Sequence, residues 1–405
     1  MKKNICAFIF LFSLVKLFSL DFSFTGSAST YASLTQPSTN GFFANVNKDL
    51  IQAEMMGLLD TSFTLYPIDN LYAQIDLSCY GSMVNYNNNN QKQRTSFFFD
   101  INQLYLNWNL NNSKICLGKK VFNFGYNNFF PLVNIVNQRR NDIVSTIYEG
   151  TGALFFSWTP FSFISFSELL YFESNDLEKD LDDISLLSII DIYYNNFGLS
   201  LYSYILDIKE FNNFPIGISM SIQFDYLTIY SELMMNMKRT KYGIVQKNEN
   251  ISIVEKETGF DFNASLGFKY YKSDFYFIAE YCFCNNGYTN EESSDIANIL
   301  NNVPAYYNSI YNKKSNFFNH NIALLFNYTF ISNLSLTVSD IITFPNFDDN
   351  ASYVGNTVTL DLSYLIQQVL QLQSIFKINI GGNNSEACLY NGEEWSLVLG
   401  AKILL

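Results

Sequence analysis

The chain has 405 residues, with 24 Lys and Arg against 37 Asp and Glu, one His and a formal net charge of −13. This acidic balance offers no basic surface to a phosphate backbone, so nucleic-acid binding is not expected, and a single His rules out most His-based chemistry. Aromatic residues make up 17 % of the chain and charged residues only 15 %, which is unusual for a water-soluble domain. The apolar side chains must therefore face something other than one compact core.

The first twenty residues have the pattern of a secretory signal peptide. Lys2 and Lys3 form a positive amino-terminal region, and an apolar run over residues 5–15 is followed by Lys16 and the small residue Ser19. The run is shorter than the ~20 residues that a membrane-spanning helix needs. We predict a signal peptide over residues 1–20, cleaved around Ser19 or Leu20. The alternative is an uncleaved membrane anchor.

No later stretch approaches 18 consecutive apolar residues, so the rest of the sequence contains no candidate transmembrane helix. An exported chain without such helices is either soluble or a β-barrel. Five cysteines remain, an odd number without a CxxC pair, which indicates neither a disulfide framework nor a zinc site. Cys282 and Cys284 would share one face of a strand, and we interpret them as small apolar fillers. No cofactor or metal is predicted.

Residues 71–84 and 104–110 alternate apolar and polar side chains with a period of two. Such alternation places one apolar and one polar face on each strand. The turn residues Asn111, Asn112 and Ser113 follow the second segment and lead into residues 114–121. Residues 104–110 and 114–121 therefore form a hairpin. Inward-facing polar positions are expected at Tyr72, Gln74, Asp76, Tyr105, Asn107, Lys114, Glu232 and Glu280.

Short turns and long polar segments alternate along the chain. Turns are predicted at residues 67–70, 111–113, 159–160, 195–196, 225–226, 272–274, 332–333 and 367–368, many of them flanked by aromatic residues. Longer segments are predicted at residues 36–48, 85–94, 122–145, 173–183, 207–215, 237–257, 285–319, 345–355 and 382–394. Short turns at one end, long loops at the other and aromatic girdles are typical of outer-membrane barrels.

The predicted fold is therefore all-β: a transmembrane antiparallel up-and-down β-barrel of about 16–18 strands with an inward-folded loop. It would form a single outer-membrane domain over residues 21–405. A soluble β-helix or sandwich would need charged outward positions, whereas here these would be Leu, Phe, Ile and Val. The last strand, residues 395–405, resembles the carboxy-terminal signal read by barrel-assembly machinery, although Leu405 stands where Phe is usual.

One segment carries a more specific resemblance. Residues 118–137, from Gly118 to Asn137, resemble the motif of alginate-export-like outer-membrane β-barrel porins, and so does the later Tyr148-Glu149-Gly150. In that family a strand ends in Gly-Arg-Gln, a Trp-Gly follows, and Phe-x-Pro-x-Asn/Asp leads into an inward loop. Here Lys119 and Lys120 replace Arg and Gln, and Phe124 replaces Trp. The resemblance covers about a tenth of the chain and implies a porin with an inward loop.

The residues of this segment also predict, without the family resemblance, a loop that leaves the barrel wall. Gly125 lets the chain leave the wall, and Pro131 prevents a strand from continuing. Amides hydrogen-bond the irregular backbone of such a loop; they are Asn123, Asn127, Asn128, Asn134 and Asn137. A loop of about 24 residues could fold inward and narrow the pore.

Basic residues surround this loop. The pore-constriction candidates are Lys119, Lys120, Arg139, Arg140 and Glu149. An Arg pair beside a constriction could bind the carboxylate or phosphate of an anionic solute. Equally, the basic residues could pair with Asp142 and Glu149 and simply hold the loop.

No enzyme is predicted. The sole histidine, His320, lacks the sequence context of outer-membrane phospholipases, and Asp340 is a lone candidate for an omptin-like acid. The acidic segment at 173–183 lacks the spacing of an EF-hand.

The predicted function is passive diffusion of small hydrophilic solutes across the outer membrane of a diderm bacterium, with a preference for anions or carboxylates. Its partners would be outer-membrane lipid, the barrel-assembly machinery and the solute, in a monomer or a homo-oligomer, with the long loops outside. The alternative is a surface barrel that acts as an adhesin or binds ligands through its long loops.

Overall fold

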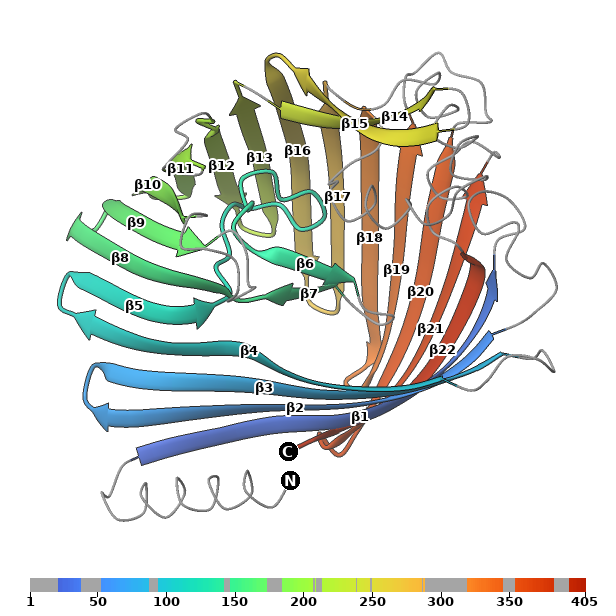
Figure 1. Ribbon diagram of the computed structural model, residues 1–405. Helices are drawn as coiled ribbons and strands as arrows, with labels where there is room; N and C mark the ends of the chain where they lie inside the picture. Colours follow the sequence, from blue (N-terminus) through green and yellow to red (C-terminus); the bar gives the residue numbers. More distant parts are fainter. Residues whose placement is uncertain are drawn as a thin grey trace.

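The computed structural model describes residues 21–37, 52–86, 94–141, 146–172, 184–206, 208, 213–237, 239–247, 250–285, 287, 319–344, 354–381 and 393–405; the predicted signal peptide lies outside them. Eighteen strands form one sheet, which closes because β1 (Asp21–Pro37) pairs with both β2 (Gln52–Ile68) and β22 (Glu393–Leu404). Figure 1 shows the resulting ring of strands. Within the described ranges, no helix is long and apolar enough to cross a membrane.

The ring follows the chain order, and each strand pairs antiparallel with its neighbours. Its other strands are β3 (Leu71–Tyr86), β4 (Arg94–Leu110), β5 (Ser113–Lys120), β8 (Thr151–Phe161), β9 (Ile164–Phe172), β10 (Ile184–Tyr194), β11 (Phe197–Ile205), β12 (Ile216–Phe224), β13 (Leu227–Asn236), β16 (Asp261–Lys272), β17 (Phe275–Cys284), β18 (His320–Ile331), β19 (Leu334–Phe344), β20 (Gly355–Ile366) and β21 (Leu370–Gly381). The predicted up-and-down barrel of 16–18 strands is confirmed, with 18 strands.

Two further hairpins lie outside the ring sheet. One consists of β6 (Gln138–Asn141) and β7 (Thr146–Glu149), and the other of β14 (Arg239–Lys247) and β15 (Asn250–Thr258). The second occupies a segment that we predicted as a plain loop. It can form its own ladder because the segment is long enough to pair with itself between β13 and β16.

Tight turns connect the strands at one end of the barrel. Several contain residues with positive φ, namely Asn70, Asn195, Ser273, Gln367 and Gln368. The turn predicted at residues 159–160 is wrong, because β8 continues to Phe161 and the turn occupies residues 162–163. Pro160 fits this strand end because the β8–β9 register shifts between Trp158 and Phe161, where its missing N–H costs no ladder bond.

The barrel wall separates two kinds of side chain. On β4, Leu104, Leu106 and Trp108 point outward and are 43–48 % exposed, whereas Tyr105 and Asn107 point inward and are 8 % and 0 % exposed. The outer surface is consequently apolar along most strands, and large aromatic side chains such as Trp158 and Phe161 stay exposed near the tight turns. Only a lipid-like surrounding removes the cost of exposing so much apolar area to water.

Inward positions are not uniformly polar. On β9 and β10 the large buried inward residues are apolar or aromatic, and they pack in one cluster with residues of the segment that enters the barrel: Phe122, Val133, Val136, Leu169, Leu187 and Ile189. By contrast, many inward residues of β2 to β4 are polar, for example Asp60, Asp76 and Ser78. One side of the barrel interior is therefore covered and the other is lined by polar groups.

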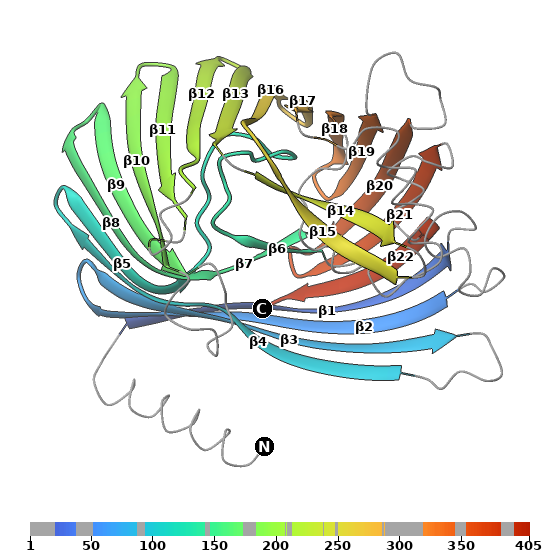
Figure 2. The ribbon, with the colours of Figure 1, turned by 45° about the horizontal axis from the view of Figure 1, so that its top comes forward.

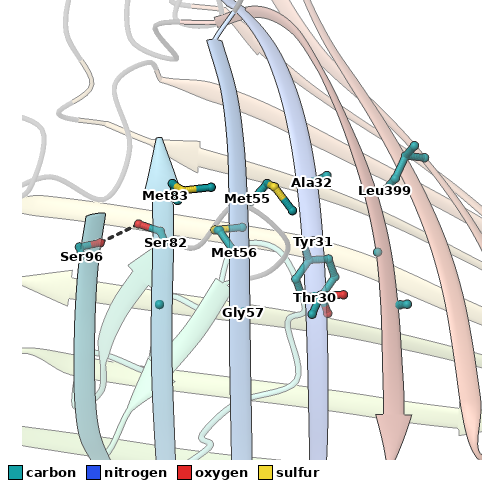
Figure 3. A pocket seen from close by; sticks show the side chains of 13 residues that line it. Thr30, Tyr31, Ala32, Met55, Met56, Gly57, Ser82, Met83, Ser96 and Leu399 are labelled. Atoms are coloured by element: carbon teal, nitrogen blue, oxygen red, sulfur yellow. Dashed lines mark hydrogen bonds between the residues drawn. The ribbon is translucent and has the colours of Figure 1, made fainter. Parts of the chain in front are cut away.

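A pocket of about 590 Å³ lies on the wall formed by β22, β1, β2, β3 and β4 (Figure 3). Tyr31, Met55, Met56, Met83 and Leu399 contribute its large side chains, and none of its lining residues is charged. This pocket lacks charged groups and contains no residue of the segment that enters the barrel. It is therefore not part of the candidate site.

Gly118 on β5 provides a test of the barrel geometry. Its φ is 127°, and an added Cβ would collide with the carbonyl oxygen of Leu104 on β4. We expect Gly118→Ala to lower the free energy of unfolding by about 1–3 kcal/mol, because it adds both backbone strain and a clash. Urea unfolding in detergent, followed by tryptophan fluorescence, measures this change.

Gly57→Ala is the matched control, because a Cβ at Gly57 would meet nothing within 4 Å. Its unfolding free energy should stay within about 0.5 kcal/mol of the wild-type value. Equal stability of the two variants would contradict the observed backbone conformation at Gly118.

Candidate functional site

The chain leaves the barrel wall after Lys120 and enters the interior before it returns as β8. Residues 121–137 are irregular, and the β6–β7 hairpin follows them. In both ribbon views this segment and the hairpin lie inside the ring of strands (Figures 1 and 2). We call residues 121–141 and 146–149 the inward loop. Its fixed position depends on side chains of distant strands.

The carboxylate of Glu232 on β13 binds two stretches of the inward loop. Its Oε1 accepts hydrogen bonds from the backbone N–H groups of Tyr126 at 2.7 Å and Asn127 at 2.9 Å. Its Oε2 accepts from those of Leu132 at 2.8 Å and Val133 at 3.3 Å. Glu232 is only 2 % exposed, so its charge is satisfied by the loop backbone rather than by water.

Glu280 on β17 binds the stretch between these two. Its Oε1 accepts from the backbone N–H of Asn128 at 2.5 Å, and its Oε2 accepts from those of Phe129 at 2.8 Å and Phe130 at 3.1 Å. The hydroxyl of Tyr230 also donates to Oε1, at 2.7 Å. Glu280 is likewise 2 % exposed.

Together the two carboxylates accept a hydrogen bond from every backbone N–H of residues 126 to 133. Pro131 occupies the single position in this stretch that has no N–H to donate. Backbone N–H groups that converge on one point form an anion-binding nest, and hydrogen bonds to a charged acceptor are stronger than those to a neutral one. We call Glu232, Glu280 and the N–H groups of residues 126–133 the carboxylate latch.

Further contacts fix the loop on the same wall. The Lys269 ammonium donates to the carbonyl oxygen of Tyr126 at 2.9 Å, and the Gly125 N–H donates to the Tyr202 hydroxyl at 3.2 Å. The hydroxyl of Tyr204 donates to the carbonyl oxygen of Val133. Apolar packing adds to these bonds, since Val133 is fully buried among side chains of β9 to β13.

Two of the predicted loop-shaping amides close the neck of the loop. The side chain of Asn137 accepts from the N–H of Phe122 at 2.9 Å and donates to the carbonyl oxygen of the same residue. It also donates to Asn134 Oδ1 at 3.0 Å. Gly125 lies inside the loop with a φ of 82°, and an added Cβ would collide with Glu232.

The two lysines at the end of β5 have different surroundings. Lys119 forms an ion pair with Asp100 at 3.7 Å. Lys120 points inward, and its ammonium lies 4.6 Å from the centre of the Tyr105 ring and 5.9 Å from that of Phe122. Asp60 and Asp76 lie on the neighbouring β2–β4 wall, where Ser78, Gln74 and Gln103 hydrogen-bond to them.

The predicted arginine pair lies on the β6–β7 hairpin. Arg139 pairs with Tyr148 and Arg140 with Ile147, while Glu149 pairs with Gln138. The side chains of these residues, and Asp142, lie outside the described part of the structure. The backbone therefore places Arg139, Arg140 and Glu149 on the inward loop. Their role in the pore stays a prediction.

The residues considered for an enzyme are not assembled into a site. His320 pairs with Phe344 on β19, its ring stacks on that of Phe344 at 5.2 Å, and its Nδ1 lies 2.7 Å from the Tyr281 hydroxyl. Asp340 pairs with Leu324 farther along the same strands. Among the residues that the structure describes, no three His, Cys, Asp or Glu side chains gather as they would around a metal ion.

Sequence reasoning placed Glu232 and Glu280 on the inward face but did not identify them as the anchors of the loop. One available signal was the single acidic residue inside each of two strands that are otherwise largely apolar, Leu227–Asn236 and Phe275–Cys284. A second was the apolar residues on both faces of Ile184–Tyr194, which indicate a wall covered from inside as well as outside.

Comparisons with solved structures identify the same barrel fold. The chain is similar to Pseudomonas aeruginosa OccK7 (OpdD), with a TM-score of 0.57, 9 % identity and coverage of 95 % of this chain and 99 % of that one. It is also similar to Acinetobacter baumannii OccAB4 (TM-score 0.56, 9 % identity, 95 % and 98 % covered) and to P. aeruginosa OccK2 (OpdF) in complex with glucuronate (TM-score 0.55, 9 % identity, 95 % and 98 % covered).

No family model and no curated protein matches the sequence. The structural matches support a closed antiparallel up-and-down β-barrel fold. They do not support the more specific alginate-export-like resemblance of residues 118–137. At such low identity the likeness establishes the fold, and the function has to be argued from the site.

The carboxylate latch makes a direct prediction for the backbone of the inward loop. In Glu232→Gln, the side-chain amide offers one acceptor oxygen instead of two, and its NH₂ group faces loop N–H donors. We expect local opening to become easier by about 2 kcal/mol, so hydrogen exchange at residues 126, 127, 132 and 133 should accelerate about thirtyfold. Mass-spectrometric hydrogen exchange of the folded barrel measures this rate.

Asp361→Asn is the control, because Asp361 on β20 accepts a hydrogen bond from Gln373 at 2.8 Å and, within the described residues, from no residue of the inward loop. Exchange in residues 126–133 should be unchanged in that variant. Unaltered exchange in Glu232→Gln would show that apolar packing alone holds the loop.

Proposed function

We propose that the protein is an outer-membrane channel through which small hydrophilic solutes diffuse passively, with the inward loop setting the constriction. The tight turns would face the periplasm, the long connections would lie outside, and the carboxy-terminal strand would be recognised by the assembly machinery. The outward apolar belt suits contact with lipid, and the closed ring leaves no unpaired strand edge in the membrane.

The observation that carries this proposal is the carboxylate latch. A loop that merely lay on the outside of the barrel would not need two buried carboxylates inside it. Because Glu232 and Glu280 belong to β13 and β17, they hold a segment that begins at β5 across the barrel interior. A segment fixed in this way narrows the interior at a defined position, which is what a diffusion channel requires for a size limit.

The charges near the loop support a preference for anions, and carboxylates in particular. Lys120 faces the interior next to the start of the loop, and Arg139 and Arg140 lie on its hairpin. Arginine can bind a carboxylate through two parallel hydrogen bonds. One of the similar structures, OccK2 (OpdF), is itself a complex with glucuronate, a carboxylate sugar.

Release of the latch should enlarge the pore. We expect the double variant Glu232→Gln, Glu280→Gln to show a larger or noisier single-channel conductance than the wild type in a planar bilayer, because the inward loop is no longer fixed. Asp361→Asn should conduct like the wild type. Wild-type barrels that insert without any conductance would contradict the channel proposal and favour ligand binding through the long loops.

The arginine pair can be tested separately through ion selectivity. We expect Arg139→Ala, Arg140→Ala to reduce the anion preference, measured as the reversal potential in a potassium chloride gradient. Lys377→Ala is the control, since Lys377 lies on β21 and not on the inward loop. Unchanged selectivity in the arginine variant would keep the channel but eliminate these residues as its selective element.

A further inference from the structure

Two cysteines that the channel does not use lie side by side inside the barrel wall. Cys282 and Cys284 are two residues apart on β17, so both face inward, and their sulfur atoms are 3.8 Å from each other. They are 0 % and 3 % exposed, and neither is in a disulfide. An isolated buried cysteine acts as a small apolar side chain, but two sulfur atoms at this distance form a pair of potential ligands.

The surroundings of this thiol pair are rich in acceptor oxygens that lack donors. Asn263 lies opposite Cys284 in the β16–β17 register, and Asn319 accepts a backbone hydrogen bond from the N–H of Cys284. The side-chain Oδ1 atoms of both asparagines are buried and have no hydrogen-bond partner among the described residues. Buried acceptors are normally satisfied, so their accumulation here favours a positively charged ligand.

The coordination chemistry narrows the kind of cation. Thiolates are soft ligands and prefer Cu(I) and similar metals, whereas Zn(II) in a structural site takes four ligands. Within the described chain no third His, Cys, Asp or Glu joins the two cysteines. Two metal–sulfur bonds of about 2.3 Å each can join sulfur atoms that are up to about 4.6 Å apart. The observed distance between the two cysteine sulfur atoms would therefore change little when both bind one metal ion.

A disulfide is the competing chemistry. It would require the two sulfur atoms to approach to about 2.05 Å, between residues whose Cα atoms on an extended strand are close to the upper limit for a disulfide. The observed geometry is therefore nearer to that of a metal-bridged pair than to that of a disulfide.

We propose that Cys282 and Cys284 form a two-thiolate binding site for a soft monovalent cation, Cu(I) or its analogue Ag(I). On binding, each thiol releases its proton and each sulfur forms one bond to the metal, which stays monovalent. Cys282 lies two residues beyond Glu280 on the same face of β17, so the site is next to the carboxylate latch. The proposal does not depend on solute conduction.

The test is a Cu(I) titration of the reduced, folded barrel in detergent, in competition with the chromogenic chelator bicinchoninate. We expect one Cu(I) per chain in the wild type, and Cys282→Ser or Cys284→Ser to weaken binding by about a hundredfold or more, because one of two ligands is lost. Cys116→Ser is the matched control: Cys116 is also buried but has no paired sulfur, and its removal should leave the affinity unchanged.

A second measurement uses the unaltered chain, so that it does not depend on folding of the serine variants. Ag(I) should protect Cys282 and Cys284 from alkylation by N-ethylmaleimide during partial unfolding, and should leave the alkylation of Cys79 unaffected. Equal affinity in wild type and Cys282→Ser, absence of protection, or a disulfide between the two cysteines in the isolated protein would each overturn the proposal.

Discussion

Two carboxyl side chains buried inside a barrel can be tolerated only if something nearby supplies hydrogen-bond donors. Glu232 and Glu280 find them in the backbone of the inward loop, and that backbone finds in them the acceptors that its irregular conformation lacks. Neither partner would be stable inside the barrel without the other. This mutual dependence fixes the position of the loop, and much of the interior is arranged around it.

The latch explains why the two halves of the interior differ. Where the loop covers β9 to β13, most of the large inward side chains are apolar or aromatic, because they pack against Phe122, Val133 and Val136. Where it does not, on β2 to β4, inward positions carry Asp60, Asp76 and their hydrogen-bonded amides. The barrel interior therefore has a packed side and a more polar side.

The similarity to solved barrel structures at 9 % identity shows how little of the sequence the fold itself requires. A closed antiparallel ring needs a period of two, turn residues at one end and an apolar outer belt, and many sequences satisfy those conditions. Interior side chains can change while the ring is retained. The thiol pair on β17 illustrates this freedom, because a barrel strand does not require cysteine at either of its inward positions.

The sequence by itself determined the barrel, because alternation and turn chemistry are local: Asn195 and Ser273 adopt the positive φ of their turns regardless of what lies across the pore. It also located the inward loop, because Pro131 has no N–H for a strand ladder and the asparagines can hydrogen-bond irregular backbone. Only the tertiary structure decided what holds that loop, because Glu232 and Glu280 lie 99 to 152 residues along the chain from the N–H groups they bind. Such pairings depend on closure of the ring, which brings β5, β13 and β17 around one interior, and no local pattern records that geometry.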